Sequence, residues 1–128
     1  MILPGTAGHS CWAATTVGTA SYTTREGTYV KIGGLVYFRC FVDWNSGTGT
    51  GSLLIKGLPF TSAGVYTAVT ISYPNNLNPG ANNYVANGYI EQSTTYFNPV
   101  QAAVGGSITP ALTYDAAAGL MASGCYRV

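Results

Sequence analysis

The chain has 128 residues, of which 47% are hydrophobic, 12% are aromatic and only 7% are charged, and its net charge at pH 7 is +1. A chain of this length forms one domain with one core, and its few scattered basic residues exclude the positive surface that DNA or RNA binding requires. Repulsion between like charges normally keeps protein surfaces from aggregating, and this chain has few charges to provide it. We therefore expect copies of the chain or a larger assembly to cover part of its surface.

Residues 1–16 are expected to form an arm that precedes a single β domain over residues 17–128. The arm lacks the charged region and apolar run of a signal peptide, and no stretch of ~20 residues is apolar enough for membrane insertion. Because Ile2, Leu3 and Trp12 make the arm more apolar than a frayed terminus, we predict that these side chains dock on a neighbouring protein. The alternative is an ordinary frayed end.

From Tyr22 onward, short runs typical of strands alternate with clusters of Gly, Pro or Asn typical of turns. Gly33-Gly34 fits a two-residue hairpin and residues 45–51 form a longer loop, so residues 29–56 should form an antiparallel meander. Pro59 then ends the ladder, and Leu58 and Phe60 are expected to plug the end of the core. The predicted strands cover residues 22–25, 28–32, 35–44, 52–56, 66–73, 84–92, 107–114 and 121–128, with at most one turn of helix near residues 115–119. This pattern predicts an all-β fold, an antiparallel β-sandwich or jelly roll of about eight strands.

The strand expected over residues 35–44 has two unequal faces. One face is wholly apolar and should lie in the core, and the other is too apolar for open water. A neighbouring subunit or a second layer of the same chain would cover that other face, and the subunit is the favoured reading. The core-facing positions are Val36, Phe38, Cys40, Val42 and Trp44, and the opposite positions are Leu35, Tyr37, Arg39, Phe41 and Asp43.

The three cysteines, Cys11, Cys40 and Cys125, are an odd number without CxxC spacing. This argues against a disulfide scaffold and against a zinc site. We expect reduced thiols with Cys40 in the core. A clamp between Cys11 and Cys125 is the alternative, since chain ends often lie close together.

Catalytic residues are scarce. His9 is the only histidine, and the adjacent Ser10 and Cys11 cannot form a nucleophile–base pair with it in strand geometry. The carboxylates lie on different predicted elements, so they form neither an evident glycosidase pair nor a calcium loop. We therefore predict no enzymatic activity, no cofactor and no metal. The four carboxylates are Glu26, Asp43, Glu91 and Asp115.

An Asn-rich loop over residues 74–83 and many tyrosines suggest carbohydrate recognition, since sugars stack on aromatic rings and bond to amides. The same composition is also expected without a ligand, because Tyr favours strands and Asn favours turns. The candidate contacts with a glycan or host receptor are Asn75, Asn76, Asn82, Asn83, Tyr84 and Tyr89.

Two segments, residues 27–33 (GTYVKIG) and 51–60 (GSLLIKGLPF), resemble a module of bacteriophage virion proteins. Similar stretches occur in tail-fibre tips and other virion surface proteins, including those of cyanophages. The resemblance implies a homotrimeric β-sandwich that is assembled in the host cytoplasm and exposed on the virion surface.

The resemblance implies two functions. A fibre protein needs an attachment region and a shaft of repeats, whereas this sequence enters the module near residue 20. The expectation is therefore a capsid decoration, or cement, protein that binds the major capsid protein or other virion proteins. The alternative is the receptor-binding head of a tail fibre, with a host surface glycan as its partner.

Overall fold

The computed structural model of the chain describes residues 2–4, 12–14, 20–49, 51–106, 108–113 and 115–128. In this part of the chain every element is a strand, and every pair of strands is antiparallel. The described strands are β1 (Ile2–Pro4), β2 (Trp12–Ala14), β3 (Ala20–Ile32), β4 (Leu35–Gly47), β5 (Leu54–Lys56), β6 (Thr67–Asn75), β7 (Asn83–Ile90), β8 (Tyr96–Ala103), β9 (Ile108–Ala111) and β10 (Ala118–Arg127).

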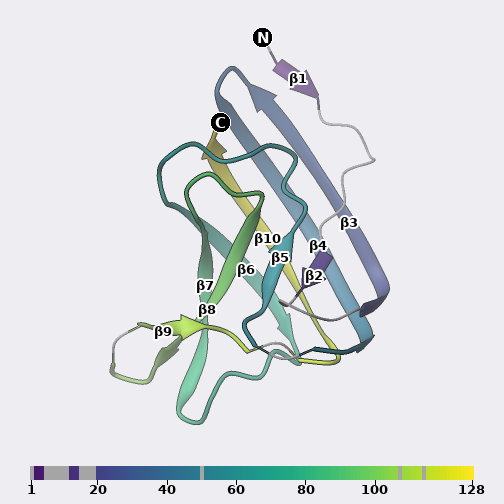
Figure 1. Cartoon of the computed structure of the whole chain (residues 1–128), viewed down its shortest axis with the longest axis vertical. Coiled ribbons are helices and arrows are strands. Elements are labelled where there is room, and N and C mark those ends of the chain that lie inside the picture. The colour runs from purple at the N-terminus through teal and green to yellow at the C-terminus, as the bar shows by residue number, and fades with distance from the viewer. Residues whose placement is uncertain (1, 5–11, 15–19, 50, 107, 114) are drawn as a thin grey trace.

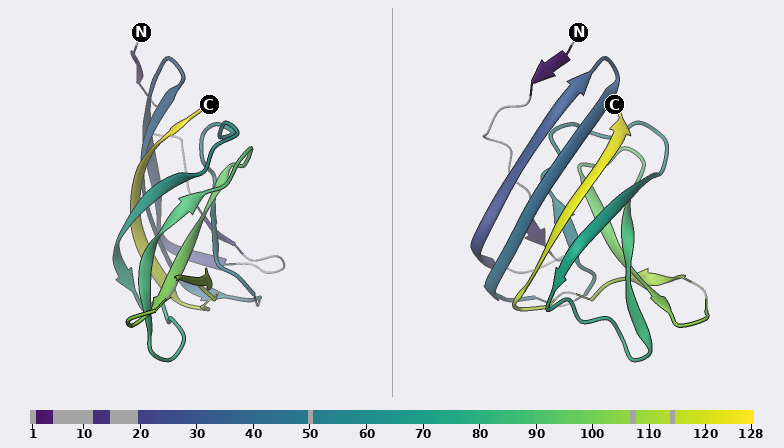
Figure 2. Two further views of the ribbon diagram at one scale, coloured as in Figure 1. Left: turned by 90° about the vertical axis from the view of Figure 1, so that its left-hand side faces the viewer. Right: turned by 180° about the vertical axis from the view of Figure 1, so that it is seen from behind.

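The strands form one continuous sheet that curls over on itself into two facing layers (Figures 1 and 2). Its order is β1-β3-β4-β10-β6-β7-β8-β5-β2, and β9 pairs with β8. Strand β6 joins the layers, because residues 67–69 pair with β7 while residues 70–75 pair with β10. The predicted all-β, sandwich-like architecture is confirmed.

The longest hairpin joins β3 to β4 through the predicted Gly33-Gly34 turn. Ile32 pairs with Leu35, and Gly33 has a φ of 56°, at the first central position where a type II′ turn needs glycine. The two strands expected over residues 22–25 and 28–32 are a single strand, β3. Gly27 does not interrupt it, because it is buried opposite Cys40 and stays in the ladder.

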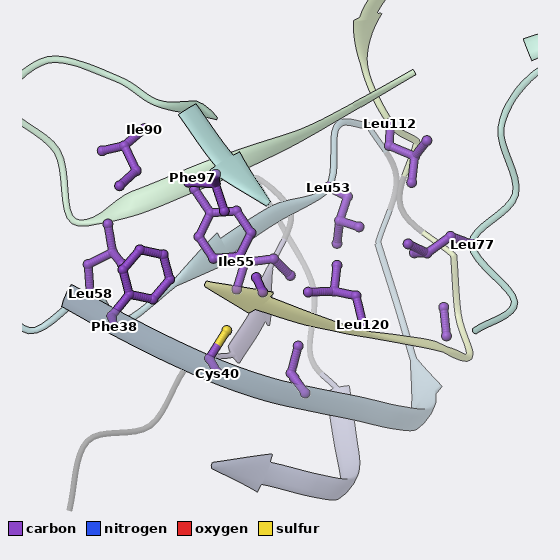
Figure 3. Close-up of a cluster of buried hydrophobic side chains, with 14 of the residues drawn as sticks. Phe38, Cys40, Leu53, Ile55, Leu58, Leu77, Ile90, Phe97, Leu112 and Leu120 are labelled. Carbon is purple, nitrogen blue, oxygen red and sulfur yellow. The ribbon is translucent and has the colours of Figure 1, made fainter. Parts of the chain in front are cut away.

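The core lies between the two layers, and the alternation predicted for β4 is confirmed (Figure 3). Phe38 meets Phe97 of the other layer at 6.0 Å between ring centroids and Tyr126 of β10 at 5.9 Å. Aromatic rings at these separations attract one another beyond the effect of area burial. The largest fully buried side chains are Trp44, Tyr126, Phe38, Phe97, Leu53, Ile55, Ile90, Leu112, Leu120, Val36, Val42 and Val69.

The segment over residues 51–60 seals one end of this core. Leu53 and Ile55 are fully buried, and Gly57 has a φ of 98°, a conformation that only glycine adopts readily. Leu58 is buried, and Phe60 packs edge-on against Tyr29 at 5.5 Å between ring centroids. The predicted plug is confirmed.

Further expectations of secondary structure are wrong. The expected meander does not continue past β4, because β5 pairs with β8 and β2 in the other layer. No strand was expected over residues 96–103, where the structure has β8 with Pro99 in its middle. Proline is tolerated there because it lies opposite Gly88, next to a register shift in the β7–β8 ladder. The helical turn expected over residues 115–119 is a bend that leads directly into β10, whose Ala118 pairs with Trp44.

The described parts of the predicted arm belong to the sheet of this chain. Ile2 pairs with Ile32 at one edge, and Trp12 pairs with Lys56 at the other. Among the described residues no helix is long and apolar enough to cross a membrane.

Candidate functional site

The outward side of the β3-β4-β10-β6 layer exposes large apolar side chains. The exposed fraction is 51% for Ile32, 47% for Leu35, 54% for Tyr37 and 39% for Met121. The right-hand view of Figure 2 looks onto this layer. We call this surface the open face and define it by Ile32, Leu35, Tyr37, Phe41, Tyr73 and Met121.

The open face carries a shallow depression beside its aromatic side chains. Phe41 packs edge-on against Tyr73 at 5.9 Å between ring centroids. The depression, of about 230 Å³, is lined by Tyr37, Met121 and Ser123 among others. Exposed apolar side chains gathered on one face are typical of contacts between proteins.

The same side of the layer also carries exposed charges, Glu26, Arg39 and Arg127, of which two are paired. Arg39 Nη2 lies 3.6 Å from Glu26 Oε1, with both side chains more than half exposed. Such a pair contributes little to stability, because water and salt screen it. The sequence left open whether a second layer of the same chain covers this side, but that layer packs on the opposite side of β4.

A second feature, the loop pocket, is a cavity of about 390 Å³ at the end of the molecule where β6 leads into β7. Its walls come from the loop between these strands, from β8 and from the segment that precedes β10. The residues that define the loop pocket are Asn78, Pro79, Gly80, Ala81, Gln101, Thr113 and Asp115.

The loop wall is held from both sides. Leu77 is buried in the core and anchors the loop from below. Gln101 Oε1 accepts hydrogen bonds from Gly80 N–H at 2.7 Å and from Asn83 Nδ2 at 3.3 Å. Asn83 N–H also donates to Gly80 O at 3.0 Å, which closes the turn. The loop therefore has a fixed conformation although its tip is exposed.

The opposite wall is fixed through Asp115. Its backbone carbonyl accepts the indole N–H of the buried Trp44 at 2.7 Å. Its carboxylate Oδ1 accepts Ala117 N–H at 3.1 Å. Asp115 is thus held in one position by a core side chain and by the following turn.

Glu91 is the centre of a separate network. Its carboxylate accepts hydrogen bonds from Tyr96 Oη at 3.2 Å and from the buried Asn98 Nδ2 at 3.1 Å. Burial, followed by the negative charge of Glu91, raises the pKa of Tyr89 and of Tyr96. Since Ser62 Oγ also donates to the Glu91 carbonyl at 2.6 Å, the network joins three segments of chain.

The predicted glycan contacts do not form one surface. Asn76 and Asn82 have φ values of 53° and 63°, so both serve the turn geometry that Asn tolerates. Asn83 is half-buried against Gln101, whereas Tyr89 lies near the other end of β7, with its ring 6.0 Å from that of Tyr66. Of the other two predicted contact residues, Asn75 is the last residue of β6 and Tyr84 is 53% exposed.

The four carboxylates lie in separate surroundings. Glu26 and Asp43 both lie in the layer of the open face, and Glu26 pairs with Arg39. Glu91 is bound within its own network, and Asp115 lines the loop pocket. No group of three potential metal-ligating side chains is found in the described part of the chain.

The remaining predicted residues are placed as follows. Ile2, Leu3 and Trp12 lie in the short edge strands, and their docking on another protein stays a prediction. Cys40 is buried as expected, and Cys125 is an exposed free thiol opposite Tyr37. His9, Ser10 and Cys11 lie outside the described residues.

Sequence reasoning missed the loop pocket as a unit. Asp115 was considered only as one of four scattered acids, and Gln101 lies on β8, where no strand was expected. These side chains reach the loop only through the folding of the sheet, in which β8 pairs with β7 and β10 pairs with β4 and β6. Comparison of the chain with protein-family models, curated proteins and solved structures finds no match.

Proposed function

We propose that the chain is a structural protein of a bacteriophage virion, a decoration or cement protein that forms trimers on the capsid surface. Its likeness to phage virion modules, carried by residues 27–33 and 51–60, supports the phage assignment. The observation that carries the assembly role is the open face, an exposed apolar surface on a chain with 7% charged residues.

Burial of the open face would stabilise an assembly. Each Å² of apolar surface removed from water contributes about 25 cal/mol, and Tyr and Met are enriched where proteins meet. In a closed trimer the interface is heterologous, so the open face of one subunit meets a different surface of the next. Tyr37 and Met121 lie beside the depression, where a side chain of the neighbour would insert.

The first test is the mass of the purified chain by native mass spectrometry and light scattering at micromolar concentration. We expect three times the 13.3 kDa chain mass. The double variant Tyr37→Lys/Met121→Lys should be monomeric but folded, because both side chains point to solvent. Val104→Lys, at a 76% exposed position outside the open face, is the matched control and should stay trimeric. A wild-type monomer would contradict the proposal.

The second test locates the chain in the virion by quantitative mass spectrometry against the major capsid protein. Near-stoichiometric abundance supports capsid decoration. A handful of copies indicates the tail-fibre alternative, and absence from purified virions overturns both.

A further inference from the structure

The loop pocket has the size and the rigidity of a small-molecule site. Its volume of about 390 Å³ lies within the range of ligand pockets in proteins. Its walls are held by contacts made outside the cavity, through Leu77 in the core and through Trp44, whose indole binds the Asp115 carbonyl. Fixed walls lower the ordering cost of binding.

The polar groups in the loop pocket suit a ligand rich in hydroxyls. Asp115 Oδ1 already accepts Ala117 N–H, whereas Oδ2 accepts no hydrogen bond from the described residues. A carboxylate oxygen is a strong acceptor for a hydroxyl proton. The hydroxyl of Thr113 and the amide of Asn78 both donate and accept, and both side chains are exposed in the cavity.

The loop pocket also has a small apolar part and a definite charge. Pro79 and Ala81 provide apolar surface beside the polar groups. Among the described lining residues Asp115 is the one with an ionisable side chain, and they include no Lys, Arg or His. Phosphate, sulfate and carboxylate groups would be repelled here.

We infer that the loop pocket binds a neutral sugar unit of a saccharide. Asp115, Thr113 and Asn78 bond to its hydroxyls, and Pro79 and Ala81 contact the C–H face of its ring. The loop wall of this site belongs to the Asn-rich segment over residues 74–83, but none of the six individually predicted contact residues, Tyr84 and Tyr89 included, is among its lining residues. The inference goes beyond the proposed assembly role and does not depend on it.

The test is a titration of the ¹⁵N-labelled full chain, followed by NMR, with the methyl glycosides of glucose, mannose and galactose at millimolar concentration. We expect saturable shifts of the backbone amides of Gly80, Ala81, Gln101 and Asp115. The methyl glycoside of glucuronic acid differs from that of glucose only in a carboxylate at C6. It should bind several-fold more weakly because Asp115 repels it.

The matched variants are Asp115→Asn and Asp43→Asn. Asp115→Asn keeps an oxygen to accept Ala117 N–H, so the turn and the fold are retained, and binding should weaken about tenfold. Asp43→Asn makes the same chemical change outside the loop pocket and should bind as the wild type does.

Three results would overturn the inference. The first is no saturable shift with any of the three neutral glycosides, together with no Asp115-dependent binding to an array of neutral oligosaccharides. The second is equal binding by the two variants, and the third is tighter binding of the glucuronic acid glycoside. None of these results bears on the trimer, which is measured separately by mass.

Discussion

At the scale of single residues, Glu91 is the acid with the most hydrogen-bonding partners in the described structure. Tyr96, Asn98, Ser62 and Thr94 all donate to it, two through its carboxylate and two through its carbonyl. Asn98 and Ser62 are buried, so each depends on this acid for a hydrogen bond that water cannot replace. The network therefore holds the turn after β7 onto β8.

The tyrosines beside Glu91 predict a loss of stability at alkaline pH. Burial and then the Glu91 charge raise the pKa of Tyr89 and Tyr96 above the ordinary value of 10.0. The unfolded chain therefore releases these protons first as pH rises. Their contribution to the free energy of unfolding is complete below pH 10.0 and is lost as pH rises through the raised values.

Tyr96→Phe tests this assignment by urea unfolding at a series of pH values. The variant should lose about 0.5–1.5 kcal/mol at neutral pH with the hydrogen bond to Glu91. Its free energy of unfolding should then fall less steeply above pH 10.0. Glu91→Gln should reduce the alkaline slope without abolishing it, since burial remains the larger cause. A Tyr96→Phe slope equal to that of the wild type would show that this tyrosine does not contribute.

At the scale of elements, the β7 bulge depends on a glycine. Asn87 has a φ of 59°, and its side-chain oxygen accepts the N–H of Ile71 at 3.0 Å. The next residue, Gly88, lies so close to β8 that a Cβ atom would lie 2.6 Å from the backbone oxygen of Asn98. Because that oxygen belongs to the backbone, the clash cannot be relieved by a rotamer change.

Gly88→Ala should therefore lower the free energy of unfolding by about 1–3 kcal/mol. Gly64→Ala is the matched control, because a Cβ there would meet no atom within 4 Å. The control should change stability by less than about 1 kcal/mol. Urea midpoints for the two variants decide the matter, and equal losses would mean that the contact with Asn98 is not the cause.

The sequence predicted correctly those strands whose hydrophobic pattern and flanking turn residues both indicate the same structure. The alternation in β4 and the glycines at 33 and 34 placed the long hairpin, because both depend only on neighbouring residues. Strand β8 was not predicted, and a proline such as Pro99 argues against a central strand. Only its partner, the bulged β7, makes proline acceptable there.

Of the two candidate sites, one could be predicted from neighbouring residues in the sequence and the other could not. The outward side of β4 was visible in the sequence, because Leu35, Tyr37 and Phe41 stand at alternate positions together with Arg39 and Asp43. The loop pocket was not, since Gln101 and Asp115 come from strands and turns far apart in the chain. No spacing in the sequence encodes the distance between them, because it is set by how β8 and β10 pair with other strands.

At the scale of the whole molecule, Cys125 reports on whether the open face is covered. Its thiol is exposed, and its residue pairs with Tyr37. In a Cys11→Ser background, the rate of maleimide labelling of Cys125 should fall several-fold as the protein concentration rises to values at which the chain is a trimer. The buried Cys40 should remain unlabelled in the folded chain.

A cysteine at an exposed position outside the open face controls for the effect of concentration on the reagent. Val104→Cys in a Cys11→Ser/Cys125→Ser background should be labelled at the same rate at every protein concentration. If Cys125 also reacts at a constant rate while the chain is a trimer, then another surface forms the interface.

The position of β10 has a consequence for synthesis. This strand comes last in sequence among the ten described, yet it lies between β4 and β6 and contributes Leu120 and Tyr126 to the core. While the ribosome is still making residues 118–127, β4 and β6 each present an unpaired edge, and such edges recruit other chains. The nascent chain must therefore wait for these ten residues before its main layer closes, so a ribosome that stalls before Ala118 leaves an aggregation-prone polypeptide.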